Sequence, residues 1–409
     1  MRKIVAANTV SQLVGKGLSA IATFVVTLLI ARQLGASGYG DFVKITTYVA
    51  FFYLLADFGI NAVYLQQAES RTSWPSLVCI RTIGGLLLIA CALGIVTLLP
   101  GTRTAGYTSF VRLGILLYSP TILFQAWITT GNAVFQKRLR YDFAAWAIFF
   151  GSLVTVGLLW ALLFVWQVPA VTGALLALVA GSVVTAATTI YFAFRLHPFA
   201  IPHISGADIR RLFLPSIPLG ITLLFNLVYF RADSVVLTLT RPTAEVGVYG
   251  LAYKVFEVVL VFPTFFMNAV YPFMVKEQHV NLKKIFTNSF LFLLVTSLAS
   301  LLILWFTAPA LTLVKSDFAP SISALRVLSL GLPFFFVTSA TMWVLVALKK
   351  QSALAVIYGV SMIVNIIGNI LLVPIYGFMA AAWLTGISEG LVLVLSGFVL
   401  VQSFSLSKK

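Results

Sequence analysis

The chain has 409 residues, of which 60% are hydrophobic and only 9% are charged, and its formal net charge is +16. A soluble protein carries about 25% charged residues, so this composition excludes a soluble globular protein and indicates a membrane protein. The positive charge is dispersed over short polar segments, as membrane topology requires, and therefore does not indicate a nucleic-acid partner.

Apolar segments long enough to cross a bilayer occupy nearly the whole chain. A helical span needs about 20 apolar residues, whereas an outer-membrane strand alternates apolar and polar residues over about ten. The continuous apolar segments therefore predict an all-α polytopic membrane protein with 12 transmembrane helices. In chain order the predicted spans are Thr9–Ala31, Phe42–Tyr64, Leu77–Leu99, Phe110–Thr130, Phe143–Val165, Val171–Phe194, Leu214–Thr240, Val248–Val275, Ile285–Phe306, Ile322–Leu348, Ala353–Val373 and Phe378–Val401.

Lysine and arginine are distributed unevenly over the segments between these spans. With a cytoplasmic N-terminus, sixteen of the 27 basic residues fall in cytoplasmic segments and four in outer loops. Cytoplasmic loops of membrane proteins carry an excess of lysine and arginine. We therefore expect both termini to lie in the cytoplasm.

Two charged residues stand out in the first two predicted spans. Lys16 lies about one third of the way into the first span from its cytoplasmic end, and Asp57 lies in the second, on the same face as Asn61. Asp57 fits either of two roles: a protonatable group that couples transport to an ion, or a hydrogen-bonded helix contact.

Three arginines lie within a few residues of the predicted ends of other spans. They are Arg81, Arg112 and Arg326. Long arginine side chains near a helix end reach the lipid headgroups, so we expect these three at the membrane surface and outside the functional site.

The longest inner loop, residues 195–212, contains Pro and Gly residues that mark a joint. It predicts two domains, residues 1–200 and 201–409, with six helices each. Short motifs repeat in the same order in both: Tyr39-Gly40 with Lys44 five residues after the tyrosine returns 210 residues later, and the four letters NAVY at 61–64 return 207 residues later. Six helices per half predict a parallel repeat with a central site between the halves, toward which Lys16 would point.

The predicted hairpin from Leu214 to Val275 carries four charges deep inside its apolar segments. A charge at the centre of a bilayer costs at least about 2.5 kcal/mol, so it normally faces a partner or a wet cavity. We therefore expect this hairpin to form one wall of a polar transport cavity. Its four charges are Arg231, Asp233, Lys254 and Glu257.

Each of these charges fits more than one role. Arg231 is predicted either to bind a phosphate group through its forked donors or to form an ion pair with a neighbouring helix. Asp233, nearly opposite on the helix, cannot pair with Arg231 and is expected to hold a helix contact. Lys254 and Glu257 share a helix face and either neutralise each other or contact the substrate.

The last two predicted spans contribute Glu389, which is interpreted like Asp57, and Asn365 and Asn369, which predict interhelical hydrogen bonds. The three histidines lack metal-ligand spacing, and no Gly-rich phosphate loop is present, so no metal, no cofactor and no direct use of ATP are expected. The longest outer loop offers only Lys315 and Asp317, which argues against an enzyme such as a glycan polymerase or ligase.

Five segments occur in a characteristic order and spacing: ARQLGASGYGDF at 31–42, DFGINAVYLQQ at 57–67, YFRADSVVL at 229–237, EVGVYGLAYKVFE at 245–257 and NIIGNILLVPIYGFMAAAWLTGISE at 365–389. Together they resemble the polysaccharide repeat-unit flippases, the O-antigen exporters of Wzx type, in the MATE-like exporter superfamily. The resemblance covers essentially the full chain.

The resemblance implies a V-shaped exporter of two pseudo-symmetric six-helix bundles in the bacterial inner membrane. Its substrate would be an oligosaccharide linked to undecaprenyl pyrophosphate, moved to the periplasmic leaflet for O-antigen, capsule or exopolysaccharide synthesis. Lys16, Arg231 and Lys254 would bind the headgroup. The implied partners are membrane lipids, H+ or Na+ as coupling ion, a polysaccharide polymerase and a chain-length regulator.

A second interpretation keeps the same fold. The drug-extruding members of the superfamily rely on membrane carboxylates for cation coupling, and this chain contains such carboxylates. An ion-coupled small-molecule antiporter, with Asp57 or Glu389 as the coupling group, is therefore the alternative.

Overall fold

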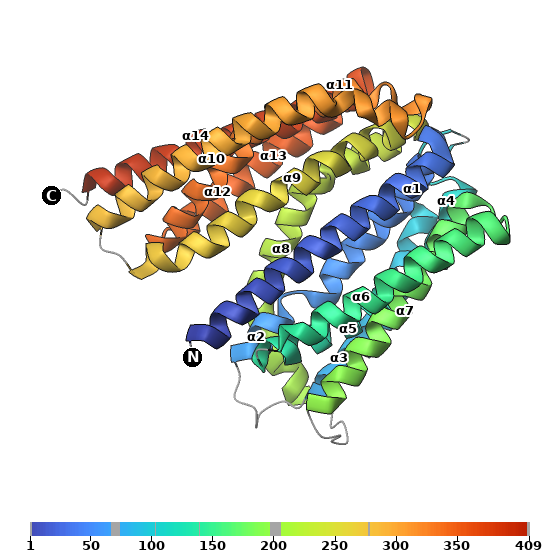
Figure 1. Cartoon of the computed structure of the whole chain (residues 1–409), viewed down its shortest axis with the longest axis horizontal. Coiled ribbons are helices and arrows are strands. Elements are labelled where there is room, and N and C mark those ends of the chain that lie inside the picture. Colours follow the sequence, from blue (N-terminus) through green and yellow to red (C-terminus); the bar gives the residue numbers. More distant parts are fainter. Residues whose placement is uncertain are drawn as a thin grey trace. The chain divides into compact units, whose positions relative to one another are not determined.

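The computed structural model describes residues 2–66, 74–102, 104–138, 140–196, 206–276 and 279–406, and the described side chains begin at Thr23. Within these ranges the chain is helical, and the one β feature is an isolated bridge between Gly101 and Gly106. The prediction of an all-α polytopic membrane protein is confirmed (Figure 1).

The elements follow one another along the chain with short connections. They are α1 (Arg2–Asp57), α2 (Ile60–Gln66), α3 (Trp74–Leu98), α4 (Ser109–Tyr118), α5 (Thr121–Lys137), α6 (Tyr141–Trp160), the π-turn η1 (Ala161–Val165), α7 (Ala170–Leu196), α8 (Gly206–Thr240), α9 (Thr243–Lys276), α10 (His279–Thr307), the 3-10 turns η2 (Ala308–Leu313) and η3 (Ser316–Phe318), α11 (Ser321–Leu330), α12 (Leu332–Ala347), α13 (Gln351–Tyr376) and α14 (Phe378–Leu406).

Ten helices of the described residues are long and apolar enough to cross a membrane, or up to eleven if α8, which is bent, counts as a span. This number is close to the predicted twelve without confirming it. The difference arises in the bent α8 and in α1, where the two predicted spans run together as one helical element through Gly35. Gly35 has φ 68° and ψ −177°, a conformation that glycine adopts readily, so the chain turns there without a connecting loop.

The chain forms two compact units. The first consists of Met1–Leu34 and Asp41–Leu227, and the second of Gly35–Gly40 and Val228–Lys409. This division differs from the predicted one at residue 200, because the first part of α8 packs on the first unit: the Phe213 ring stacks on Phe58 with centroids 5.6 Å apart. The parallel repeat of the two halves stays a prediction.

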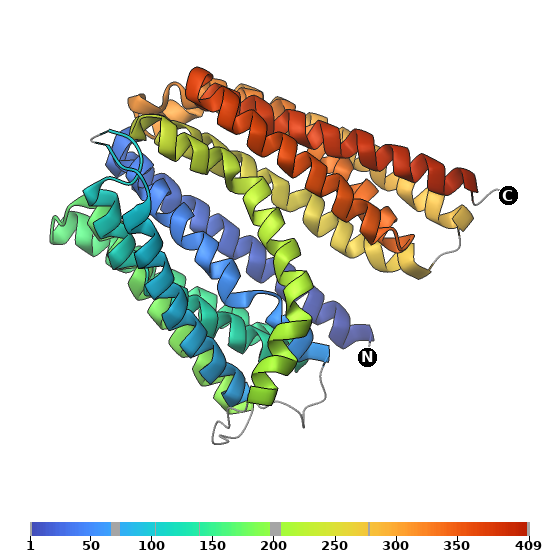
Figure 2. The ribbon, with the colours of Figure 1, turned by 180° about the vertical axis from the view of Figure 1, so that it is seen from behind.

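In the first unit α3, α5, α6 and α7 pack side by side (Figures 1 and 2). The contact of α6 with α7 depends on small residues. A Cβ on Gly151 would lie 1.8 Å from Thr185 Oγ1, and a Cβ on Gly181 would lie 1.8 Å from Thr155 Oγ1. Small residues let helix backbones approach closely in lipid, where no hydrophobic effect draws helices together.

In the second unit α9, α11, α12 and α14 pack against one another, and α10 and α13 pack on them (Figure 2). Residues 35–40 of α1 belong to this unit and lie against the start of α9. A Cβ on Gly40 would lie 2.0 Å from the Thr243 carbonyl, and one on Gly247 would lie 1.9 Å from the Ala36 carbonyl. The glycines of two quoted motifs therefore allow these two segments to touch.

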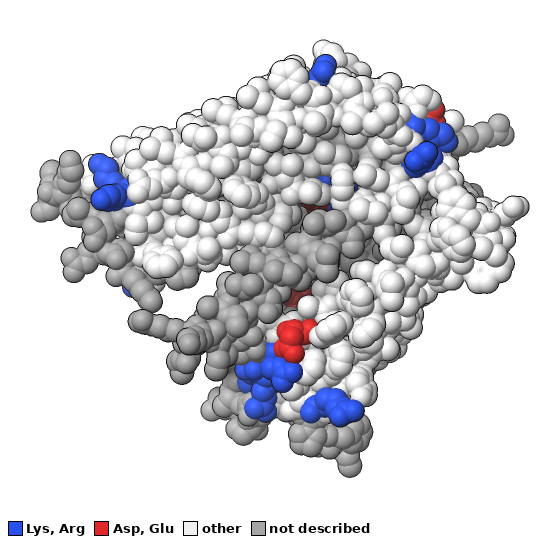
Figure 3. Space-filling view, in the orientation of Figure 1, with Lys and Arg blue, Asp and Glu red and all other residues white. Residues whose placement is uncertain are grey.

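The exposed surface of the helices is apolar. Side chains such as Leu87 and Val295 are more than 60% exposed although they lie in the middle of long helices. On the face drawn in Figure 3, charged atoms form a few small groups within broad uncharged areas. Such a surface fits contact with lipid. Lipid tails are as apolar as these side chains, so no hydrophobic free energy is lost when the side chains stay exposed to them.

Candidate functional site

Three of the predicted charges meet in the second unit. Arg231 of α8 donates from Nη2 to Glu257 Oε1 at 3.0 Å, and Lys254 of α9 donates from Nζ to Glu257 Oε2 at 2.9 Å. One carboxylate thus serves two cations, and the group keeps a net charge of +1. We call these three residues the ion triad.

The ion triad lies far from the helix ends. Arg231 precedes the end of α8 by nine residues, which is about 13 Å along the helix, and Glu257 follows the start of α9 by about 21 Å. About a third of each side chain stays exposed: 28% for Arg231, 30% for Lys254 and 35% for Glu257. The cations are therefore both paired and reachable.

Tyr253 holds the Arg231 guanidinium from a second side. The guanidinium carbon lies 5.5 Å from the centre of the Tyr253 ring, within the range of a cation–π contact. The Tyr253 hydroxyl in turn donates to the Phe230 carbonyl at 3.3 Å. The position of Arg231 thus does not depend on Glu257 alone.

Asp233 of α8 links its helix to α9 and α14. It is 4% exposed, and its carboxylate accepts hydrogen bonds from the Tyr249 hydroxyl of α9, from Thr385 Oγ1 of α14 at 3.4 Å and from the Ser234 backbone N–H at 2.6 Å. The expectation that Asp233 holds a helix contact agrees with this geometry.

Glu389 of α14 is equally buried, at 3% exposure. Its Oε2 accepts a hydrogen bond from the Tyr229 hydroxyl of α8 at 3.1 Å. Within the described part of the chain, neither Glu389 nor Asp233 forms a salt bridge. Both carboxylates accept hydrogen bonds from hydroxyl groups instead.

The predicted asparagines on α13 take part in the same polar interior. Asn365 donates from Nδ2 to Ser388 Oγ of α14 at 2.9 Å, which confirms an interhelical bond. Asn369 donates to the backbone carbonyl and the side-chain oxygen of Asn365, so the prediction of an interhelical bond is wrong for Asn369. Its own Oδ1 is buried with no hydrogen-bond partner among the described residues.

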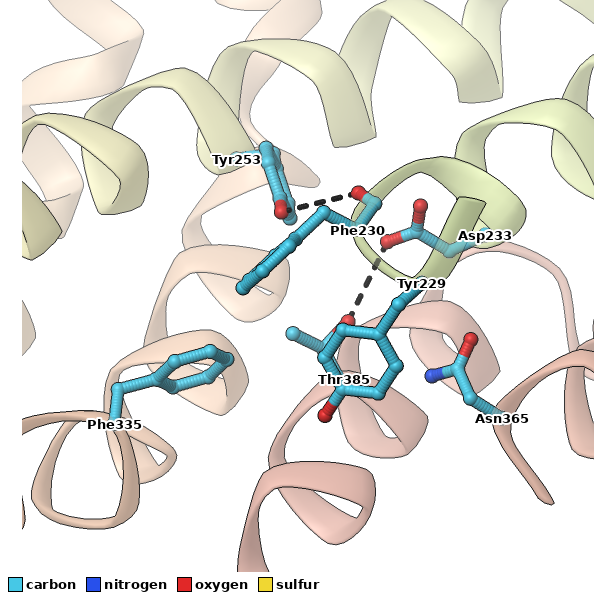
Figure 4. Close-up of a pocket in the computed structure, with 7 residues that line it drawn as sticks. All are labelled: Tyr229, Phe230, Asp233, Tyr253, Phe335, Asn365 and Thr385. Atoms are coloured by element: carbon cyan, nitrogen blue, oxygen red, sulfur yellow. Dashed lines mark hydrogen bonds between the residues drawn. The ribbon is translucent and has the colours of Figure 1, made fainter. Parts of the chain in front are cut away.

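A small pocket opens between these helices (Figure 4). Figure 4 shows Asp233 and Thr385 pointing toward one another, with the Asn365 amide and the Tyr229 ring beside them. The pocket is lined by Tyr229, Phe230, Asp233, Tyr253, Phe335, Asn365 and Thr385.

The pocket is too small for a sugar. Its unfilled space is about 210 Å³ including open solvent, and only about 10 Å³ is open to the centre of a water molecule. That is roughly the space of one water. The oxygen atoms that line the pocket are suitable ligands for water or for a small hard cation. Among the described residues, no group of three His, Cys, Asp or Glu side chains is arranged to bind a metal ion.

In the first unit, Asp57 pairs with Arg81 of α3. Arg81 Nη2 donates to Asp57 Oδ1 and to Asn61 Oδ1, both at 2.8 Å, and Nη1 donates to Thr130 Oγ1 at 3.4 Å. The Arg81 side chain is 1% exposed, so the expectation that it reaches the membrane surface is wrong. The helix starts at Trp74 rather than Leu77, which places Arg81 about 10 Å from the helix start.

The two other arginines near span ends bond to the ends of neighbouring helices. Arg112 Nη2 donates to the Leu99 carbonyl, next to the end of α3, at 2.8 Å. Arg326 Nε donates to the Trp305 carbonyl in the last turn of α10 at 3.3 Å. Basic side chains commonly satisfy the free carbonyls of a helix end in this way.

A further ion pair, Arg241 with Glu245, lies at the turn between α8 and α9 and also bonds to the turn between α13 and α14. Arg241, between α8 and α9, donates to Glu245 at 2.7 Å and to the Pro374 carbonyl at 3.3 Å, while Glu245 Oε2 accepts from the Phe378 N–H at 3.4 Å. The hydrogen bond that Arg241 donates to Glu245 raises the pKa of the Arg241 guanidinium above its ordinary value, so it stays charged. The end of α13 and the start of α14 are fixed to the α8–α9 turn.

The structure thus brings Arg231, Lys254 and Glu257 into one contact, and places Asp233 and Glu389 in a polar interior nearby in the same unit. The side chain of Lys16 lies outside the described residues, so its predicted role stays a prediction. The sequence did not identify Tyr229, Tyr249 and Thr385 as partners, because a tyrosine or threonine in an apolar span gives no signal of its own.

Comparisons with known proteins agree with this fold. A lipid II flippase, MurJ, in an inward closed conformation superposes with a TM-score of 0.77 at 15% identity, over 96% of this chain and 88% of that chain. An inward-facing multidrug resistance MATE family transporter of the MOP superfamily gives 0.77 at 13% identity, over 95% of each chain. A MOP superfamily transporter from Pyrococcus furiosus Vc1 gives 0.66 at 14% identity, over 100% and 96%.

At these identities the structural similarity shows the fold alone, and no curated protein matches the sequence. The family models add the relationship. The MatE model matches residues 218–371, and the model of the polysaccharide biosynthesis proteins matches residues 5–278, well over half of the chain. The chain is therefore a multi-pass membrane protein that belongs to the polysaccharide biosynthesis protein family and has the fold of the MOP-superfamily transporters.

Proposed function

We propose that the protein is a Wzx-type flippase that moves polyprenyl-pyrophosphate-linked oligosaccharide repeat units across the inner membrane, from the cytoplasmic to the periplasmic leaflet, by alternating access. The product would enter O-antigen, capsule or exopolysaccharide synthesis. The family relationship supports a role in polysaccharide synthesis, and a structural neighbour is named as a flippase of another lipid-linked molecule.

The observation that carries the proposal is the ion triad. Arg231 and Lys254 lie in apolar helices, keep an excess positive charge and are about a third exposed. A cation at this depth in the membrane is energetically unfavourable, so its presence indicates a function. A pyrophosphate headgroup supplies one, since a guanidinium gives forked donors to phosphate oxygens and an ammonium adds a point charge.

In this mechanism the headgroup enters from the cytoplasm past Lys16, pairs with Arg231 and Lys254, and leaves toward the periplasm. The polyprenyl tail stays in lipid, because removing its apolar surface from hydrocarbon would gain nothing. The headgroup contacts are made to the pyrophosphate, so one site would serve different sugars.

The test uses proteoliposomes that contain undecaprenyl pyrophosphate carrying a fluorescent oligosaccharide. Translocation is measured as the protein-dependent change in the fraction of label that a membrane-impermeant quencher reaches. Arg231→Glu is expected to reduce translocation at least about tenfold, the effect of one charge-assisted contact. Arg241→Gln is the matched control, because it removes an arginine from an ion pair outside the triad.

Two results would contradict the proposal. Wild-type protein that translocates no labelled lipid would reject the flippase function. Arg231→Glu that translocates as fast as Arg241→Gln, at equal expression, would remove the triad from the mechanism.

The ion-coupled antiporter remains the second candidate function, and the buried carboxylates favour it. Asp233 and Glu389 are hydrogen-bonded to hydroxyls without a salt bridge among the described residues, which fits groups that exchange a proton or a small cation. The two candidates differ in one assay. An antiporter raises resistance to cationic drugs in cells, and Glu389→Gln abolishes that resistance, whereas a flippase leaves drug resistance unchanged.

A further inference from the structure

The geometry of the ion triad points to a second role for Glu257. We propose that Glu257 is a built-in competitor of the substrate: its carboxylate occupies Arg231 and Lys254 when the site is empty, and the pyrophosphate displaces it on binding. This inference rests on the proposed function, because it assumes that the pyrophosphate headgroup reaches these two cations.

The way in which the Glu257 carboxylate shares its two oxygens between the cations supports the proposal that a stronger anion can displace it. Each carboxylate oxygen takes one cation, at 3.0 Å to Arg231 and 2.9 Å to Lys254. Within the described residues, these bonds use one of the five N–H donors of the guanidinium and one of the three of the ammonium. A pyrophosphate offers more acceptor oxygens and more negative charge than one carboxylate, so it can satisfy the donors that Glu257 leaves free.

The surroundings allow Glu257 to leave without releasing Arg231. The Arg231 guanidinium also rests on the Tyr253 ring at 5.5 Å, and the Tyr253 hydroxyl is fixed on the Phe230 carbonyl at 3.3 Å. The Glu257 side chain is 35% exposed, so its movement uncovers no sealed contact. Asp233 and Glu389, the other carboxylates of this interior, have their own hydroxyl partners and need not follow.

A competing carboxylate has a use in transport. Two free cations would hold a pyrophosphate tightly at every stage, and binding that is uniformly tight slows release. If Glu257 returns to the cations as the headgroup leaves, part of the lost interaction is replaced. Affinity is lowered and turnover is raised by the same residue.

The test measures binding and transport on the same variants in the purified full chain. The ligand is undecaprenyl pyrophosphate without sugars in lipid nanodiscs, and transport uses the labelled oligosaccharide lipid. Glu257→Gln keeps the shape of the side chain and removes its charge. Glu245→Gln is the matched control, because it removes the same charge from another ion pair on the same helix, α9.

Glu257→Gln is expected to lower the Kd about tenfold, with a steeper loss of affinity at high salt, and to lower the translocation rate at saturating substrate. Glu245→Gln is expected to leave both unchanged. Glu257→Asp, which keeps the charge but is one methylene shorter and cannot reach both cations equally, is expected to be intermediate. A residue that only supports the fold would not move affinity and rate in opposite directions.

The outcomes separate the inference from the function beneath it. If wild-type protein binds and translocates the lipid but neither Glu257→Gln nor the well-folded Glu257→Asp binds it more tightly, Glu257 is not a competitor and the flippase function stands. If wild-type protein neither binds nor translocates the lipid, the proposed function fails, and this inference fails with it.

Discussion

The charged residues singled out inside the apolar helices are accommodated in two different ways. Arg81, Arg231 and Lys254 are paired with carboxylates, in the Asp57–Arg81 pair and in the ion triad. Asp233 and Glu389 are bonded to tyrosine hydroxyls instead. The first arrangement forms a salt bridge, whereas the second leaves each carboxylate without a salt bridge among the described residues.

The Asp57–Arg81 pair gives the first prediction at the residue scale. Asp57→Asn leaves the Arg81 guanidinium buried without its counter-charge and is expected to destabilise the protein by about 3 kcal/mol. Asp142→Asn breaks the Arg140 pair, in which both side chains are over 40% exposed, and is expected to change stability by less than about 1 kcal/mol. Thermal unfolding in detergent checks this, and equal losses in the two variants would contradict it.

The Asp233 carboxylate gives the second prediction at the residue scale. Tyr249→Phe removes a hydroxyl donor from a buried carboxylate and is expected to cost about 1–3 kcal/mol, seen as a lower melting temperature. Tyr376→Phe removes a hydroxyl from a side chain that is 66% exposed and should have no measurable effect. If Tyr249→Phe has the same melting temperature as the wild-type protein, the Tyr249 hydrogen bond contributes little to the stability of the second unit.

At the scale of the elements, glycines let pairs of helices approach each other closely. Gly151 and Gly181 let α6 and α7 touch, and Gly40 and Gly247 do the same for α1 and α9. The glycines at 40 and 247 were noticed in the sequence as parts of family segments. Their role in packing was not apparent, because a glycine gives no indication of which helix will face it.

The α6–α7 contact gives the third prediction. Gly151→Ala would place its Cβ 1.8 Å from Thr185 Oγ1 and 2.7 Å from the Gly181 carbonyl, so the helices must separate and the melting temperature should fall. Gly157→Ala lies on the same helix with nothing within 4 Å, and should be neutral or stabilising by about 0.5–1 kcal/mol. A Gly151→Ala protein as stable as Gly157→Ala would show that the contact is loose.

At the scale of the whole molecule, the number and direction of the spans are the main predictions still to be tested. The long Arg2–Asp57 element and the bent α8 explain why ten or eleven candidate spans are found where twelve are predicted. A topology experiment resolves the count, because each missing span would invert every later connection.

The fourth prediction uses single cysteines in a protein whose Cys79 and Cys91 have been replaced by alanine. A membrane-impermeant maleimide added to intact cells is expected to label Gln167→Cys and Lys315→Cys. Lys137→Cys and Lys350→Cys are expected to react only after permeabilisation. Labelling of Lys350→Cys in intact cells would contradict the twelve-span topology with a cytoplasmic N-terminus.

The sequence alone determined that this is an all-helical membrane protein, because hydrophobic length is a local property and a bilayer accepts few structures. It also identified the charges that matter, since any charge in an apolar span stands out. The spacing of Lys254 and Glu257 on one helix predicted either a mutual ion pair or contact with the substrate, and the structure shows the ion pair.

Only the tertiary structure decided which partner each charge has. Arg81 was expected at the surface and is buried, because its distance from the helix end depends on where α3 begins and its direction depends on α5. The Thr385 hydroxyl that bonds Asp233 and the Tyr229 hydroxyl that bonds Glu389 come from helices more than 150 residues away in the chain. Contacts between distant segments are fixed by packing, and packing leaves no periodic trace in a sequence that is apolar on every face.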